Sequence, residues 1–154
     1  MDTNNKEGLT LIELVVVLFI ITIAAGGLML GNRRGNMDYR NLRYAAYMIQ
    51  TDLRYAQRRA IMEGRTFEVL FNRGLGNYSI IQRTPIVILR TVYLRKGVEI
   101  MGFTHIGEPV LGFHPRGTPM RATTLTLASG IYTVNITVTP SGGRVKVYPI
   151  ERQN

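Results

Sequence analysis

The sequence contains no cysteine and no tryptophan, and its only histidines are His105 and His114. Without cysteine, the chain cannot form a disulfide scaffold, a thiolate zinc site or a cysteine nucleophile. The two histidines could meet Glu108 around a metal, but they lie in a loop-rich region and their spacing fits no tight ligand motif. No serine–histidine–acid set and no pair of carboxylates can be identified either. We therefore predict no enzyme activity, no cofactor and no metal site.

Acidic residues are scarce relative to basic ones. The 154 residues include 19 basic and 10 acidic side chains, a net charge of +9, and 16 of the basic residues are arginine. Such an excess suits an acidic partner such as nucleic acid or anionic lipid, although a basic solvated surface is the plainer interpretation. No run reaches five like charges, which excludes a basic tail. The length favours one domain.

One long hydrophobic run is present. Residues 1–8 are polar, and residues 9–30 then carry a single charge, Glu13. A helix of this length spans roughly 33 Å, enough to cross a hydrocarbon core of about 30 Å. The run therefore predicts a transmembrane helix. A secretory signal peptide is the alternative, with residues 24–26 as its cleavage site, but it would need a positive segment where residues 1–8 carry a net negative charge.

The charges around this run allow more than one interpretation. Basic residues follow the span, whereas Lys6 alone precedes it, and this distribution taken by itself predicts a cytoplasmic C-terminal part. A carboxylate costs about 2.5–3.5 kcal/mol at the bilayer centre and less near its edge. Glu13 is therefore either an interfacial residue favoured by the positive end of the helix dipole, or the partner of a cation on another chain.

The start of the run resembles the class III signal of type IV pilins and type II secretion pseudopilins, with the sequence Gly-Leu-Thr-Leu-Ile-Glu-Leu-Val-Val-Val-Leu at residues 8–18. The resemblance implies a leader at residues 1–8, cleavage between Gly8 and Leu9 by a prepilin peptidase, and N-methylation of Leu9. It implies that Glu13 answers the terminal amine of a neighbouring subunit during assembly. It also implies an N-terminus in the cytoplasm, which we place above the count of flanking charges. The family usually starts its mature chain with phenylalanine and often has a proline near the end of the span; this chain has Leu9 and no such proline.

A second helical pattern follows the hydrophobic run. Residues 31–36 are rich in glycine and asparagine and predict a flexible break, so that residues 31–64 read as a break followed by an amphipathic helix. An apolar stripe recurs there at intervals of three and four residues, and Gly64 suits the helix end. We expect the stripe to pack on the chain's own sheet. Its members are Leu42, Ala46, Ile49, Leu53, Ala56 and Ala60.

The remaining residues, 65–154, have the alternating pattern and the turn residues of β-strands. Hairpin turns are expected at residues 72–77 and 140–143. The strands are expected at residues 66–71, 78–82, 86–94, 98–101, 110–113, 123–127, 132–139 and 144–148. We therefore predict an α+β fold. A long N-terminal helix, membrane-spanning in its first half and amphipathic in its second, packs on an antiparallel β-domain that forms a sandwich or two small sheets.

Three segments resemble the minor pseudopilin H group of type II secretion: residues 52–61, residues 113–119 and residues 142–145. The resemblance implies a structural subunit of a filament. Its partners would be other pilins or pseudopilins, the prepilin peptidase, membrane lipid and an inner-membrane assembly platform with its ATPase. The subunit would wait in the bacterial inner membrane with its C-terminal domain outside, and then join an extracytoplasmic filament. The alternative is a minor pilin of a DNA-uptake pilus, in which arginine and lysine side chains contact phosphate. The residues proposed for such contacts are Arg54, Arg58, Arg144 and Lys146.

Overall fold

In the part of the chain that the structure describes, one long helix is followed by nine short strands. The computed structural model describes residues 11–104 and 109–153, and within these it excludes the side chains of residues 26–34. The chain divides into two compact units, Met1–Asn36 and Met37–Asn154. The predicted leader, with Gly8 and Leu9, lies outside the described residues.

The helix α1 extends from Leu11 to Glu63. Its backbone is helical through residues 31–36, where the sequence predicted a flexible break. Glycine and asparagine weaken a helix by up to about 1 kcal/mol each, but without proline no backbone donor is lost, so the helix can continue through them. Gly64 follows the end of the helix with a φ of +61°, and the Arg65 amide donates to the Ala60 carbonyl at 3.3 Å. This is a typical glycine-stopped helix end, as predicted.

In the first unit, every described side chain from residue 11 to residue 25 is exposed. The large apolar residues in this stretch therefore bury little surface within their own chain. In the part of the chain that the structure describes, no helix is both long enough and apolar enough to cross a membrane.

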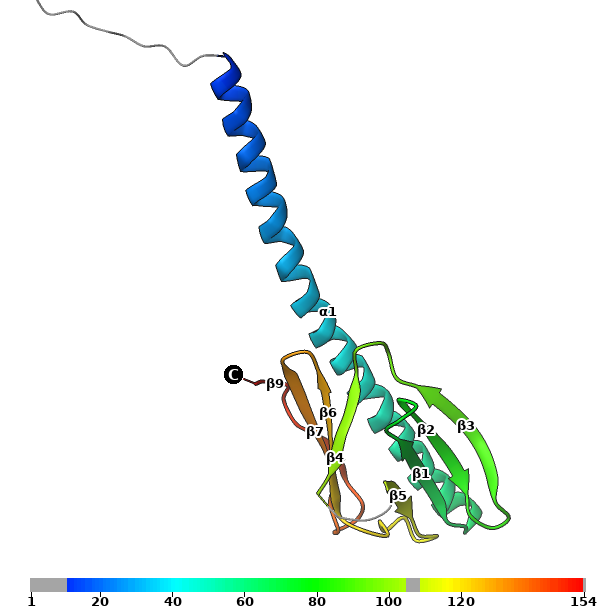
Figure 1. The fold of residues 1–154 in the computed structure, drawn as a ribbon. Coiled ribbons are helices and arrows are strands. Elements are labelled where there is room, and N and C mark those ends of the chain that lie inside the picture. Colours follow the sequence, from blue (N-terminus) through cyan, green and yellow to red (C-terminus); the bar gives the residue numbers. More distant parts are fainter. Residues whose placement is uncertain (1–10, 105–108, 154) are drawn as a thin grey trace, which may run out of the picture. The chain divides into compact units, whose positions relative to one another are not determined.

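In the second unit, the predicted stripe on α1 is buried against the strands. Its six members are at most 2% exposed, and Ala45 joins them at 3%. They belong to a single core cluster with residues from both sheets. Figure 1 shows both sheets alongside this part of α1. The prediction that the stripe packs on the chain's own sheets is confirmed.

The strands form two antiparallel sheets. Sheet A has the order β3-β2-β1-β5, and sheet B has the order β4-β6-β7-β8, with β9 also paired to β7. Sheet A contains β1 (Phe67–Asn72), β2 (Asn77–Gln82), β3 (Val87–Tyr93) and β5 (Val110–Phe113). Sheet B contains β4 (Glu99–Phe103), β6 (Thr123–Ser129), β7 (Tyr132–Val138), β8 (Val145–Val147) and β9 (Glu151–Arg152). The α+β fold with two small sheets is the predicted one.

The sheets meet in the core through large side chains. Phe71 on β1 packs against Phe103 on β4 with ring centroids 5.4 Å apart. In β6 and β7 the side chains alternate between buried and partly exposed, which places Leu125, Leu127 and Ile136 in the core. This alternation is what a half-buried antiparallel strand requires.

Candidate functional site

Glu13 lies in the first turn of α1 and is exposed in the single chain. The positive end of the helix dipole favours a carboxylate at this position. Counted from Leu9 as the first residue, Glu13 is the fifth, but Gly8 and Leu9 lie outside the described residues. The structure therefore locates Glu13 in α1, and its predicted role in assembly and the predicted cleavage site both stay predictions.

A buried polar cluster joins α1 to sheet A. The Tyr78 hydroxyl on β2 donates to Asp52 Oδ2 on the helix at 2.6 Å, and Arg90 on β3 forms an ion pair with Asp52 Oδ1. Asp52 is 3% exposed and Tyr78 is fully buried. Burial is the main cause that raises the pKa of Tyr78 well above its usual value, and the hydrogen bond to Asp52 raises this pKa further. The cluster fixes the helix to two strands.

Sequence reasoning missed this cluster, although it had a detectable signal. Asp52 lies three residues after Ile49 and four before Ala56, so it falls on the apolar stripe itself. An acid on a buried helix face needs a partner, because an unpaired charge in the core is costly. The partners come from residues 26 and 38 positions away, which no local pattern could identify.

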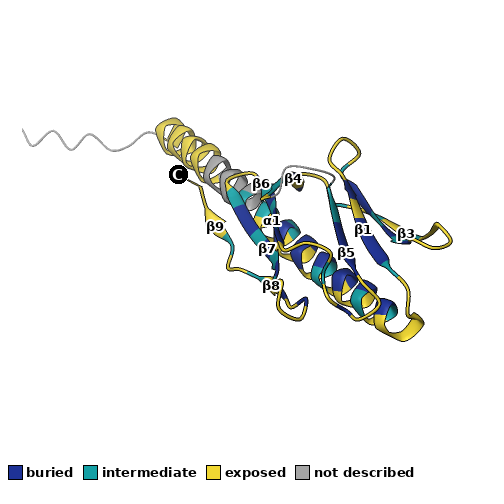
Figure 2. Cartoon of the chain, turned by 90° about the horizontal axis from the view of Figure 1, so that it is seen from below, coloured by how far each residue is buried: buried dark blue, intermediate teal, exposed yellow. Residues whose placement is uncertain are grey.

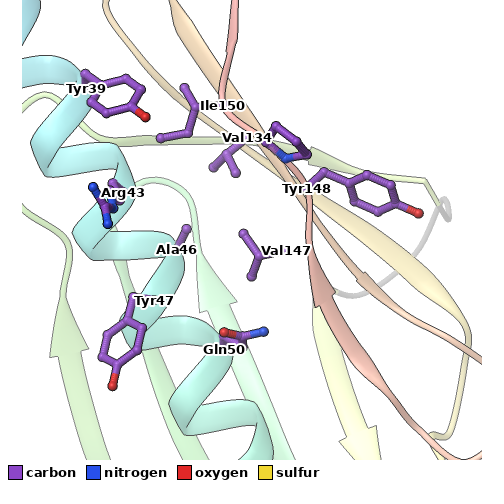
Figure 3. Close-up of a pocket in the computed structure, with 10 residues that line it drawn as sticks. Tyr39, Arg43, Ala46, Tyr47, Gln50, Val134, Val147, Tyr148 and Ile150 are labelled. Atoms are coloured by element: carbon purple, nitrogen blue, oxygen red, sulfur yellow. The ribbon is translucent and has the colours of Figure 1, made fainter.

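A groove of about 280 Å³ lies between α1 and the segment around β8. Figure 3 shows the helix residues on one side and the residues of the C-terminal segment on the other. Its walls combine apolar side chains with tyrosines, one arginine and one glutamine. The lining residues are Tyr39, Arg43, Ala46, Tyr47, Gln50, Val134, Val147, Tyr148, Pro149 and Ile150. The groove offers a mainly apolar surface, and its lining residues form no catalytic set.

The four cations predicted to contact nucleic acid are exposed and come from neighbouring elements. Arg54 lies on α1 between Gln50, which donates to the Val145 carbonyl at 3.3 Å, and Gln57, which donates to the Gly142 carbonyl at 3.0 Å. Arg144 lies between those two carbonyls along the chain, Lys146 follows on β8, and Arg58 is one helical turn beyond Arg54. Lys146 Nζ also packs 4.5 Å from the centre of the Tyr148 ring. The structure thus brings the backbone of residues 142–145, which includes Arg144, beside the helix turns that carry Arg54. Lys146 alternates along β8 with Val145 and Val147, which are more buried, so its side chain points to the other side of the strand.

Of the three residues considered for metal binding, the structure describes only His114. His114 is exposed, and its backbone closes a turn by accepting from the Gly117 amide at 2.8 Å. His105 and Glu108 lie outside the described residues. Among the residues that the structure describes, no group of three histidine, aspartate or glutamate side chains could hold a metal ion.

Comparisons with known proteins agree with this architecture. The family model of type II transport protein GspH matches residues 45–142, and the model of the prokaryotic N-terminal methylation motif matches residues 3–29. None of the curated proteins matches the sequence.

Solved structures of similar fold include the minor pseudopilin EpsH from the type 2 secretion system of Vibrio cholerae, with a TM-score of 0.60 and 17% identity. That match covers 70% of this chain and 96% of EpsH. The type IV minor pilin FimU of Pseudomonas aeruginosa matches with a TM-score of 0.59 and 18% identity, over 72% of this chain and 90% of FimU. At these identities the likeness concerns the fold alone.

Proposed function

The chain belongs to the GspH family of type II transport proteins, and on this premise we propose that it is a minor pseudopilin-like structural subunit of a type II secretion or type IV pilus filament. The subunit waits in the bacterial inner membrane, with its N-terminus in the cytoplasm and residues 37–154 outside. It then enters an extracytoplasmic filament through its N-terminal helix, driven by an assembly platform with an ATPase. The exposed apolar side chains of residues 11–25 support this role, because such a surface needs lipid or neighbouring helices to cover it.

Maturation is the first step of the proposed pathway. A prepilin peptidase cleaves between Gly8 and Leu9, and the new amine of Leu9 is methylated. The match of the N-terminal methylation motif to residues 3–29 supports this step. Mass spectrometry of the membrane form should find a chain that starts at a methylated Leu9. A mature chain that starts anywhere else would contradict the proposal.

Glu13 carries the assembly step. It is the single charged residue in the apolar stretch 9–30, and it lies in the first turn of α1. In a filament core of low dielectric, an ion pair between its carboxylate and the Leu9 amine of a neighbouring subunit is much stronger than in water. Each subunit would thereby offset the charge of another, since an uncompensated buried charge is strongly destabilising.

Replacing Glu13 by glutamine tests this step with little change in shape. We expect the Glu13→Gln variant to be inserted and trimmed normally but to be missing from sheared filaments, as judged by immunoblotting of the membrane and filament fractions. The matched control is Glu99→Gln, which removes an exposed carboxylate from β4. The control should be incorporated like the wild type. Normal incorporation of Glu13→Gln would refute the pairing role.

DNA binding within an uptake pilus is a second candidate. The observation in its favour is that Arg54, Arg58, Arg144 and Lys146 are exposed, and that the segment around Arg144 lies beside the helix turns that carry Arg54. If these side chains contact phosphate, the slope of log affinity against log salt should fall by about 0.9 for each contact removed.

The test compares two doubly substituted full-length chains in detergent. Arg54→Gln with Arg58→Gln removes two of the proposed contacts, and Arg116→Gln with Arg121→Gln removes two exposed charges elsewhere. Titration with labelled DNA over a range of salt concentrations should give a shallower slope for the first variant only. Equal slopes, or no binding at low salt, would end this candidate.

A further inference from the structure

The edge strand β3 leaves much of its apolar surface exposed. It pairs with β2 on one side and ends sheet A on the other. Ile88 is 63% exposed, Tyr93 is 71% exposed, and Ile86, just before the strand, is 72% exposed. Figure 2 shows β3 outermost in its sheet. A long edge strand of this kind is a template for pairing with another chain.

Two of the other sheet edges are covered by the chain itself. On β4, Arg73 donates to the Ile100 carbonyl at 2.9 Å and also to the Met101 carbonyl. On β5, the Gly112 carbonyl accepts from the Met120 amide at 2.8 Å. These bonds occupy backbone groups that a foreign strand would need.

The β8 edge is occupied as well, and β3 differs from all three. Gln50 on α1 donates to the Val145 carbonyl on β8. Among the described elements, β2 is the only strand that pairs with β3. Within the described residues, the chain thus occupies backbone groups on β4, β5 and β8, whereas the β3 edge, which carries exposed aliphatic side chains, is available for pairing.

A groove runs beside β3 on the side that faces α1. It has a volume of about 240 Å³ and is lined by helix residues and by the second half of the strand. Tyr44 and Met48 form part of the helix wall, and Val92 and Tyr93 form part of the strand wall. In recognition by strand addition, backbone hydrogen bonds supply affinity and adjacent pockets accept alternate side chains. Both elements are present here.

The charge around β3 selects the kind of segment that fits. Residues 83–96 contain no acid and four cations, which are Arg83, Arg90, Arg95 and Lys96. Arg83 pairs with Glu68 and Arg90 pairs with Asp52, which still leaves the edge positive. A second copy of β3 would place like charges opposite one another, and this is destabilising. An acidic segment would be attracted.

We propose that β3 accepts, as an added strand, an extended segment of a different protein in which β-branched or aromatic residues are flanked by aspartate or glutamate. Alternate side chains of the segment enter the groove beside α1, and its acidic ends meet the cations that flank β3. This inference goes beyond the proposed filament role and does not depend on it.

The test selects short random peptides displayed on phage against the full-length chain in detergent. The expected result is enrichment of peptides that alternate β-branched or aromatic residues with polar ones and that carry acids. Synthetic copies should bind, and N-methylation of alternate amides on one edge should abolish binding because it removes the backbone donors. Selection without this pattern, or binding that tolerates methylation of either edge, would overturn the proposal.

Two matched variants locate the binding surface. Ile88→Lys places a charge on the edge strand and should weaken peptide binding by roughly tenfold or more. Ile131→Lys makes the same change at a residue that is 44% exposed and lies in the β6–β7 turn, and it should bind like the wild type. Equal binding by both variants would overturn the proposal. Analytical ultracentrifugation shows whether the chain self-associates. If the wild type self-associates and Ile88→Lys does not, the partner of β3 is a second copy of the chain, and the proposal is overturned.

Discussion

Asp52 is a carboxylate held in the core by two partners from sheet A. The Asp52→Ala change leaves the buried Tyr78 hydroxyl without its acceptor and Arg90 without its ion pair. We expect a loss of about 2–3 kcal/mol in the free energy of unfolding, because a buried donor without a partner bears its full desolvation cost. Urea denaturation of the full chain in detergent measures the loss. The exposed residue Glu99 provides the control, since Glu99→Ala should change stability by less than about 0.5 kcal/mol. Equal effects would mean that the cluster contributes little.

Tyr78 should make the stability of the second unit fall at alkaline pH. Burial and the hydrogen bond to Asp52 raise the pKa of the Tyr78 hydroxyl, so the folded state keeps this proton when the unfolded state loses it. The contribution of this proton to stability is fully present below about pH 10, where a tyrosine in the unfolded chain titrates, and is lost progressively above that pH.

The Tyr78→Phe variant should be less stable at neutral pH and should show a weaker decline above pH 10. Denaturant unfolding at a series of pH values gives both quantities. Tyr47→Phe is the matched control, because Tyr47 is 64% exposed and its loss should leave the pH dependence unchanged. An alkaline decline that is identical in Tyr78→Phe and in the wild type would contradict the assignment.

At the scale of elements, two adjacent glycines in the turn between β7 and β8 allow backbone strain to be distinguished from steric collision. Gly142 and Gly143 both have positive φ, at +73° and +65°. A Cβ on Gly142 would meet nothing within 4 Å, whereas a Cβ on Gly143 would lie 2.6 Å from Gln57 Nε2 and 2.8 Å from the Gly117 carbonyl oxygen. Both Gly→Ala variants therefore bear the backbone strain, and Gly143→Ala also bears a collision with α1 and a neighbouring loop.

We expect Gly143→Ala to lower the free energy of unfolding by about 1–3 kcal/mol more than Gly142→Ala does. Chemical denaturation of the two variants gives this difference directly, because the shared strain cancels. Equal losses would show that Gln57 and its neighbours can move aside for the added methyl group with no further loss of stability.

The elements themselves were largely predictable from the sequence, but their arrangement was not. The intervals in the stripe from Leu42 to Ala60 predicted the buried helix face, and eight of the nine strands matched runs of apolar and β-branched residues. The missed strand is β9, a polar pair of residues that exists because it bonds to β7. The order of strands depends on contacts between distant residues, such as the pairing of β1 with β5, and local patterns carry no information about them.

The candidate sites likewise fall into two groups: those that a local sequence motif predicts and those that depend on the packing of distant elements. The leader motif and Glu13 are readable because their residues follow one another at fixed offsets. The Asp52 cluster, the groove near β8 and the bare edge of β3 depend on which elements become neighbours. The sequence marks Arg54 and Arg144 as surface cations, but the approach of the segment around Arg144 to α1 depends on the packing of β8 on the helix.

At the scale of the whole molecule, the buried apolar side chains and the stretch of exposed apolar side chains at residues 11–25 lie in different units. Within the described residues, all buried hydrophobic side chains lie between Leu42 and Val145, inside the unit Met37–Asn154. The described side chains of residues 11–25 are exposed. The second unit thus has a core of its own, whereas the described apolar side chains of the first unit remain exposed.

A fragment of residues 37–154 should therefore fold on its own. It retains both sheets and every member of the core cluster, so its unfolding should be cooperative. We expect a soluble protein without detergent, with a melting temperature close to that of the globular transition of the full chain. Circular dichroism and calorimetry measure both. A shorter fragment that begins at residue 50 provides the contrast, because it lacks Leu42, Ala46 and Ile49 from the buried face of α1 and should be unfolded. A fragment 37–154 that aggregates or melts without a transition would show that the core depends on the preceding helix.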